Sequence, residues 1–285
     1  RLRFEVLQAD DGGLAEAATA TAQRVIDDAD VLAVVGPTAF DTVMEAGPRY
    51  SAAGLAFLIH CVTESELGDQ GFDTFLSTVP NDRQSGTAIG EWLARHPSAY
   101  GVTVIDNETP YGAEVANAIQ DVLVDDGTHY LESRESASSD DSIDAVVQDI
   151  IDSGADTVAF LGDAGQASQL AVALDSAGFT GPRITGDRAM FDQFIEAGAA
   201  AEGWYLASFF IDPASTDATS GFSDRFSQAY GYAPSGYGVR AYDATATIIE
   251  AIAGLDPEAA DRDAVFQALT GTSYQGITGE IRFGD

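Results

Sequence analysis

The sequence predicts an α/β protein built on doubly wound parallel sheets, and three observations lead to this class. Short apolar runs recur along the chain: VLAVVG (31–36), LAFLIH (55–60), GVTVID (101–106), DTVAFLG (156–162) and PRITGD (182–187). Each run is too short for a helix and too continuously apolar for a one-sided antiparallel strand. Segments with helical spacing follow most of them, such as Ile143, Val146, Val147, Ile150 and Ile151. This alternation is typical of parallel sheets that bind ligands beyond the carboxyl ends of their strands.

The remaining elements follow in chain order. We expect a strand over residues 2–8 and a helix over 14–28, whose buried stripe is Leu14, Ala18, Ala22 and Val25. A break at 96–98 precedes a second series, in which helices end in glycine and return at once to a strand, as left-handed caps allow. The later expectations are a strand at 204–210, a linker at 212–215, helices near 220–230, 238–253 and 261–269, and a closing strand at 279–283.

The charge of the chain is its most unusual compositional feature. Forty-six acidic residues face 13 basic ones, all of them arginine, for a net charge of −33 over 285 residues. Such self-repulsion weakens a compact fold in dilute buffer, but molar salt shortens the Debye length to ~3 Å. We interpret the composition as an adaptation to a very salty medium. It argues against a nucleic-acid or anionic-membrane partner, and no apolar run approaches the ~20 residues of a membrane span.

Residues that carry covalent chemistry are scarce. Cys61 is the only cysteine, so the sequence predicts neither a disulfide framework nor a thiol metal site. The three histidines are far apart in the sequence and show no metal-ligand spacing. The motifs of serine hydrolases, phosphate-binding loops, dinucleotide-binding turns and zinc enzymes are absent. We therefore expect a protein that is not an enzyme and needs no cofactor or metal.

A family resemblance begins at Val35-Gly36-Pro37-Thr38, which resembles the strand-to-helix turn of type I periplasmic-binding-fold proteins. The Leu/Ile/Val-binding branch of the ABC-transporter solute receptors is the most similar. Five further segments resemble that branch in order: FLIHCVTESEL (57–67), FDTFLSTVPND (72–82), DNETPYGAEVA (106–116), GVRAYDATATIIEAI (238–252) and YQGITGEIRF (274–283). Each segment alone is weak evidence, but six in register cover nearly the whole chain.

The resemblance implies two lobes joined by a multi-strand hinge, with the family fold trimmed at both ends. Lobe 1 would comprise 1–98 plus 214–277, and lobe 2 would comprise 99–213 plus 278–285. Hinges are expected at 97–100 and 212–215, with a third crossing at 276–279. The resemblance further implies a monomeric receptor, held at the outer face of the membrane by a lipid anchor, that delivers a small polar ligand to a membrane permease.

Two turns of the first lobe are candidate ligand sites. The turn at Thr38, Ala39 and Phe40 offers hydroxyl and main-chain N–H groups at a helix start, which suit a carboxylate. One alternative is a simple helix cap by Asp41 or Thr42. Another is that Phe40 packs an apolar or aromatic part of the ligand. The second turn is Cys61, Val62 and Thr63, in which Thr63 is the stronger candidate. Cys61 is expected to be a buried, inert thiol, because the adjacent His60 points to the opposite face.

The second lobe contributes the other candidates. The resemblance aligns Tyr111 with a tyrosine that closes over the ligand, and the alternative is a core tyrosine. Asp163 and Gln166 follow one strand, and Asp187 and Arg188 follow another. The family acid that binds a ligand ammonium falls on Asp187 or Arg188, while a solvated turn remains the alternative. The ligand class stays open between branched-chain or related amino acids, amides and organic or aromatic acids. A sensing receptor of the same fold is the second functional class.

Overall fold

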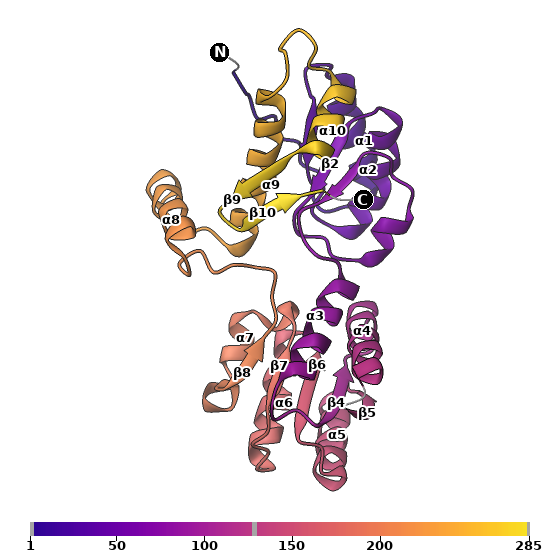
Figure 1. Ribbon diagram of the computed structural model, residues 1–285, viewed down its shortest axis with the longest axis vertical. Coiled ribbons are helices and arrows are strands. Elements are labelled where there is room, and N and C mark those ends of the chain that lie inside the picture. The colour runs from indigo at the N-terminus through magenta and orange to yellow at the C-terminus, as the bar shows by residue number, and fades with distance from the viewer. Residues whose placement is uncertain (1–2, 127–129, 284–285) are drawn as a thin grey trace. The chain divides into compact units, whose positions relative to one another are not determined.

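The computed structural model describes residues 3–126 and 130–283 and divides the chain into two compact units. Unit 1 comprises residues 1–80 and 210–285, and unit 2 comprises 81–209. Unit 2 is therefore one uninterrupted stretch of chain, whereas unit 1 is assembled from two stretches. Each unit contains its own parallel sheet with helices beside it, which confirms the predicted fold class (Figure 1).

Unit 1 is built on a three-stranded parallel sheet of order β1-β2-β3 and an antiparallel hairpin of β9 and β10. Its strands are β1 (Ala33–Val35), β2 (Ala56–Ile59), β3 (Phe75–Ser77), β9 (Ser273–Gly276) and β10 (Gly279–Arg282). Its helices are α1 (Ala15–Asp27), α2 (Phe40–Ala52), η1 (Ser65–Asp69), α8 (Asp217–Tyr230), α9 (Gly236–Ala253) and α10 (Arg262–Gly271).

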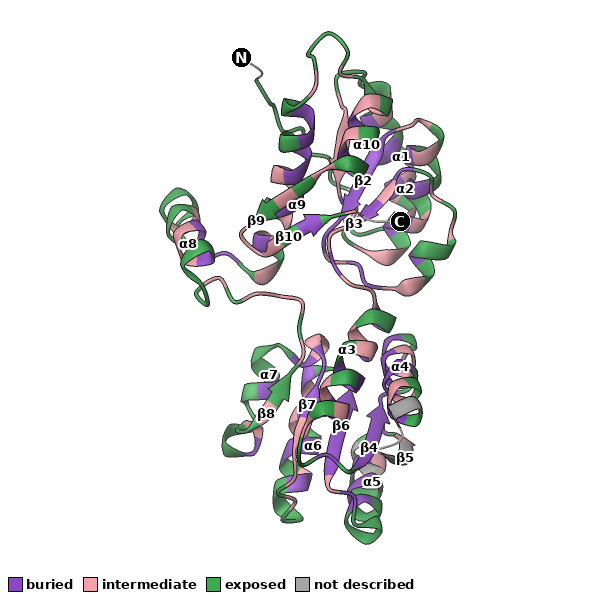
Figure 2. Ribbon diagram, in the orientation of Figure 1, coloured by how far each residue is buried: buried purple, intermediate pink, exposed green. Residues whose placement is uncertain are grey.

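Strand β2 is buried along its whole length because both faces of the sheet are covered (Figure 2). Phe57 and Ile59 pack into a cluster that includes residues of α1 and α2, while Ala56 and Leu58 pack with residues of α9 and α10. Side chains alternate between the two faces of a strand, so a central strand needs apolar residues at every position.

One side chain joins the two chain stretches of unit 1. The Arg262 guanidinium donates from Nε to the Val31 carbonyl at 3.0 Å and from one terminal nitrogen to the Ile26 and Asp28 carbonyls, each at 2.9 Å. These partners lie 231 to 236 residues away in the sequence. Arg262 therefore fixes the start of α10 against the end of α1 and the approach to β1.

The strand expected over residues 2–8 is wrong. Residues 3–8 are exposed and form no strand ladder. This segment and β1 both line a cavity of about 560 Å³. Leu14 is also wrong as a core residue, because it is 56% exposed, and Thr21 is buried on α1 instead.

Unit 2 is a five-stranded, all-parallel sheet of order β5-β4-β6-β7-β8. Its strands are β4 (Gly101–Asp106), β5 (Tyr130–Ser136), β6 (Thr157–Leu161), β7 (Arg183–Thr185) and β8 (Trp204–Leu206). Its helices are α3 (Asp82–Arg95), α4 (Pro110–Asp126), α5 (Asp140–Ser153), α6 (Ala164–Ser176), η2 (Asp187–Ala189), α7 (Asp192–Ile195) and η3 (Gly198–Ala201).

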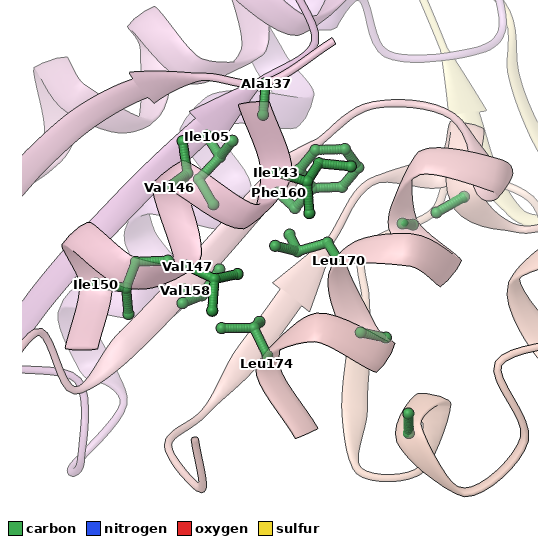
Figure 3. Packing of buried hydrophobic residues seen from close by; sticks show 14 of the residues in the cluster. Ile105, Ala137, Ile143, Val146, Val147, Ile150, Val158, Phe160, Leu170 and Leu174 are labelled. Carbon is green, nitrogen blue, oxygen red and sulfur yellow. The ribbon is translucent and has the colours of Figure 1, made fainter. Parts of the chain in front are cut away.

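The predicted helical stripe forms part of the core of unit 2. Ile143, Val146, Val147 and Ile150 of α5 face Leu170 and Leu174 of α6 and side chains of the sheet, as Figure 3 shows. Ile151, the fifth member of the stripe, is 43% exposed. Burial of a Leu, Ile or Val side chain stabilises a fold by roughly 1.5–3 kcal/mol, so this cluster is a major stabilising contact of unit 2.

The predicted lobe boundaries differ from the structure. The chain passes between units at 80/81 and 209/210 rather than at 98/99 and 213/214, so the expected hinges at 97–100 and 212–215 lie inside unit 2 and unit 1 respectively. The reason is that α3 packs closely on α4 through Gly86 and Gly90, which places α3 in unit 2.

The expected third crossing at 276–279 also differs, because residues 278–282 stay in unit 1. The buried carboxylate of Asp243 in α9 accepts the main-chain N–H of Ile277 at 3.0 Å and of Thr278 at 2.8 Å, and the Thr278 hydroxyl at 2.6 Å. The turn between β9 and β10 is thereby fixed to a helix of unit 1.

Candidate functional site

The polar residues of unit 2 gather where its parallel strands end. Tyr111 is the second residue of α4, which follows β4, and Asp187 follows the end of β7. The Tyr111 hydroxyl donates a hydrogen bond to Asp187 Oδ1 at 3.0 Å, although 76 residues separate the two in the sequence. The structure therefore brings together two predicted site residues at the sheet edge where such folds bind ligands.

Arg188 completes this group. Its guanidinium carbon lies 4.1 Å from the centroid of the Tyr111 ring, which is a cation–π contact. Gly186 allows the close approach, because a Cβ atom at that position would collide with the Tyr111 hydroxyl. We call Tyr111, Asp187 and Arg188 the unit 2 half-site.

The electrostatics of the unit 2 half-site follow from its burial. Burial raises the pKa of Tyr111, and the negative charges of Asp187 and Asp82 raise it further, so the phenol stays protonated. Burial also raises the pKa of Asp187 above its ordinary value of 3.8, while the Tyr111 hydrogen bond and the Arg188 charge act in the opposite direction. The half-site thus offers a phenol donor, a carboxylate and a guanidinium within one small region.

Asp82 is a residue of this region that the sequence analysis did not single out. It is the first residue of α3 and is only 2% exposed. Gly86 lies against Val115, and residue numbers rise together along the close contact of α3 and α4, so the two helices run parallel. One turn earlier on both helices, this register places Asp82 beside Tyr111. The available signal was the segment FLSTVPND, in which Asn81 caps α3 and Asp82 follows it.

Asp163 is a helix cap in the structure. Its side chain accepts the main-chain N–H of Gln166 at 2.9 Å and forms a capping box at the start of α6. The Gln166 side chain in turn accepts from Asn107 at 2.9 Å. Asp163 is exposed and follows β6, the strand between β4 and β7. Helix capping accounts for the contact between Asp163 and Gln166, while the bond from Asn107 ties Gln166 to the end of β4.

The first turn of unit 1 leads into α2 without a side-chain cap. The N-cap residue is Ala39, not Asp41 or Thr42, and the Thr42 hydroxyl donates to the Ala39 carbonyl at 2.8 Å. The first main-chain N–H groups of a helix have no partner within the helix, so the exposed Thr38 and the start of α2 can receive an anionic group. Phe40 is half-buried and packs against the core of unit 1.

The second turn of unit 1 lies against the first. The Cys61 thiol is 3.7 Å from the Thr38 carbonyl, so the two predicted turns are adjacent. Burial and the nearby Glu64 raise the pKa of Cys61 to about 11, which agrees with an inert thiol. Val62 is buried in the core and Thr63 is buried beside it in the turn. Thr38, Ala39, Cys61 and Thr63 form what we call the unit 1 half-site.

The residues that the structure describes contain no group of three or more His, Cys, Asp or Glu side chains placed to hold a metal ion. None of their helices combines the length and the apolar character that crossing a membrane requires.

Comparisons with known proteins show the family and the fold of this chain. A family model described as periplasmic binding protein matches residues 2–285. An amino acid binding protein of Pseudomonas aeruginosa is 24% identical over 254 residues, covering 88% of this chain and 68% of that protein. The chain spans 58% to 68% of the length of the curated relatives it matches.

Solved structures share the fold. The structure of a putative branched-chain amino acid ABC transporter from Rhodospirillum rubrum superposes with a TM-score of 0.88 at 24% identity, covering 98% of this chain and 81% of that one. A substrate-binding protein of an ABC transporter from Desulfitobacterium hafniense, in complex with Leu, gives a TM-score of 0.80 at 25% identity, with the same coverage.

Proposed function

Because this chain belongs to the periplasmic binding protein family, we propose that it is the solute-binding component of an ABC transporter and binds a small polar ligand outside the cytoplasm. The hydrogen bond between Tyr111 and Asp187 carries the proposal. This hydrogen bond joins the segments that follow two strands, at the carboxyl edge of one parallel sheet. Both residues are polar, although a stable core would not require polar side chains there.

The ligand class follows from the groups that each unit offers by itself. The unit 1 half-site offers main-chain N–H groups at the start of α2 and the Thr38 hydroxyl, which suit a carboxylate. The unit 2 half-site offers the carboxylate of Asp187, which suits an ammonium group. A branched-chain or related amino acid is therefore the first candidate, and the relatives named for amino acids support it.

One alternative concerns the ligand class and another concerns the functional role. Arg188 stands within the unit 2 half-site and is complementary to a ligand oxygen, which favours an amide or an organic acid as the second ligand class. The same fold also suits a sensing receptor, whose conformational change on ligand binding would act on a signalling partner instead of a permease. Binding without chemical conversion is common to both roles, so we propose that the protein is not an enzyme.

A thermal-shift screen in molar NaCl tests the proposed function. The panel is L-leucine, L-isoleucine, L-valine, benzoate, acetamide and urea. A ligand present at about 100 times its Kd stabilises the folded protein by roughly 2.7 kcal/mol. Asp187→Asn should abolish the shift of an amino acid, whereas Asp163→Asn, which changes only a helix cap, should retain it. A panel in which every compound leaves the midpoint unchanged contradicts the proposed ligand classes.

An ATPase assay separates the transport role from the sensing role. The solute-binding role requires that the ligand-loaded protein stimulates the ATPase activity of a permease complex reconstituted in vesicles. Stimulation that depends on ligand supports transport. Ligand binding without any stimulation, together with ligand-dependent activation of a kinase partner, supports the sensing receptor.

A further inference from the structure

The unit 2 half-site already contains a cation on the aromatic face that a ligand would use. The Arg188 guanidinium lies over the Tyr111 ring at 4.1 Å, a separation typical of a favourable cation–π contact. Tyr111 is 3% exposed, so the ring has little contact with solvent. The guanidinium therefore covers one face of a ring that is otherwise buried in protein.

The carboxylate beside the ring is also engaged from within the chain. Asp187 Oδ1 accepts the Tyr111 hydroxyl at 3.0 Å, and main-chain N–H groups of Asp187 and Arg188 donate to the carboxylate. The positive charge of Arg188 acts on the same carboxylate. A carboxylate has about four acceptor positions, so these contacts use most of its capacity. Its charge is balanced before any ligand arrives.

The backbone holds this arrangement in place. Asp187 and Arg188 belong to the short helix η2, whose last residue, Ala189, is fully buried. Gly186 leaves room for the Tyr111 hydroxyl. The guanidinium is thus attached to a segment that packs on the core of unit 2 and does not lie on a freely extended loop.

From these contacts we propose that Arg188 is a specificity-determining residue that occupies the place of a ligand ammonium and competes with it. The inference rests on the proposed function and deepens it, because it concerns which ligands the unit 2 half-site accepts. Two cations beside one carboxylate and one ring repel each other, so an ammonium-bearing ligand must displace the guanidinium. A ligand with the same carbon skeleton and no amino group carries no such cost.

The first test compares two ligands that differ only in the amino group. L-leucine and 4-methylpentanoate share the carbon skeleton and the carboxylate. Their dissociation constants are measured by calorimetry for the wild type, for Arg188→Met, and for Arg183→Met. Arg183 is a matched control, since its guanidinium carbon lies 5.8 Å from the centroid of another aromatic ring, Trp204, in the same unit.

We expect Arg188→Met to tighten L-leucine binding about 5- to 30-fold relative to 4-methylpentanoate, the range that a cation–π contact of this kind spans. Arg183→Met should leave the ratio of the two constants unchanged. A ratio that stays constant in Arg188→Met, or one that shifts toward 4-methylpentanoate, overturns the proposal.

The second test needs no solute and therefore separates failure of this inference from failure of the proposed function. Guanidinium chloride is titrated at millimolar concentration into Arg188→Ala, and tyrosine ring signals are followed by NMR with ¹³C-labelled tyrosine. The signal that disappears in Tyr111→Phe identifies Tyr111. That signal should shift with guanidinium in Arg188→Ala and stay fixed in the wild type and in Arg183→Ala.

The outcomes are distinct. If Arg188→Ala is folded and its Tyr111 signal does not shift with guanidinium, the inference is overturned, whether or not L-leucine and 4-methylpentanoate bind. A Tyr111 signal that shifts with guanidinium supports a cation site over the Tyr111 ring, even when L-leucine and 4-methylpentanoate both fail to bind. In that case the proposed ligand classes are wrong and the inference about Arg188 stands.

Discussion

Replacing Gly86 by alanine should push helices α3 and α4 apart. A Cβ atom at position 86 would collide with the Val115 carbonyl oxygen, lie 2.7 Å from the Ala118 Cβ and lie 3.0 Å from the Val115 Cα. Two of these three atoms belong to the backbone of α4, which cannot rotate out of the way as a flexible side chain could. Relief therefore requires one helix to move.

The magnitude is the difference of two effects. Alanine is favoured over glycine inside a helix by about 1 kcal/mol. Overpacking a close contact costs typically 1–3 kcal/mol. Since the neighbours are backbone atoms, we place the cost at the upper end and expect a net loss of about 1–2 kcal/mol in the free energy of unfolding. In a protein of this size each kcal/mol lowers the melting temperature by roughly 2–4 °C.

Urea unfolding in molar NaCl, with hydrogen exchange of residues 82–126 as the local readout, measures the effect. Gly221→Ala in α8 is the matched control, because Gly221 also lies inside a helix and its nearest neighbour is the end of the Arg225 side chain at 3.7 Å. That control should gain stability from helix propensity alone. If Gly86→Ala and Gly221→Ala gave the same gain, the close contact of α3 and α4 would be refuted.

Three further results are expected. The unfolding midpoint should rise steeply between dilute buffer and molar NaCl because salt screens the −33 charge, and a flat profile would contradict the interpretation of the composition. Iodoacetamide should alkylate Cys61 at pH 8 about 100-fold more slowly than a free cysteine, since burial raises the pKa of the Cys61 thiol from 9.0 to about 11. Alkylation at the rate of a free cysteine would contradict the burial of this thiol. Affinity for an ammonium ligand should be lost as the pH falls through the raised pKa of Asp187, because binding needs the ionised carboxylate. Tyr111→Phe should move this loss to higher pH, because the hydrogen bond from the Tyr111 hydroxyl lowers the pKa of Asp187. Calorimetry across pH 4–8 measures both effects, and an unmoved midpoint in Tyr111→Phe would argue against the hydrogen bond.

The sequence predicted the strands that are buried on both sides. Runs such as GVTVID are buried at every position and mostly apolar, as expected of a strand covered on both faces of its sheet, and this pattern has few alternative explanations. The segment at residues 2–8 mixes apolar side chains with Arg3, Glu5 and Gln8, and residues 3–8 form no strand ladder. Its apolar pattern contains no information on the distance to a partner strand. Strand pairing is a tertiary property, so the prediction failed there.

The candidate site was predictable in part. Tyr111, Asp187 and Arg188 follow strand ends, and turn position alone places them at one edge of a sheet. Asp163 follows a strand end as well, yet its contact with the main chain of Gln166 makes it a cap. Helix capping and ligand binding use the same residue types at the same place in the chain. Only the contacts in the folded structure distinguish the two roles. Asp82 was missed because a buried acid at a helix start resembles an ordinary exposed one.

The interrupted course of unit 1 imposes an order on its synthesis and folding. Arg262 must reach the carbonyl groups of Ile26, Asp28 and Val31, but about 180 residues are translated between position 80 and position 262. At 5–20 residues per second this takes roughly 10–35 seconds, during which the first stretch of unit 1 waits without its second stretch. Unit 2 is complete at residue 209 and can form its sheet within that interval. The nascent apolar strands of residues 33–77 are therefore the part of the chain most in need of a chaperone.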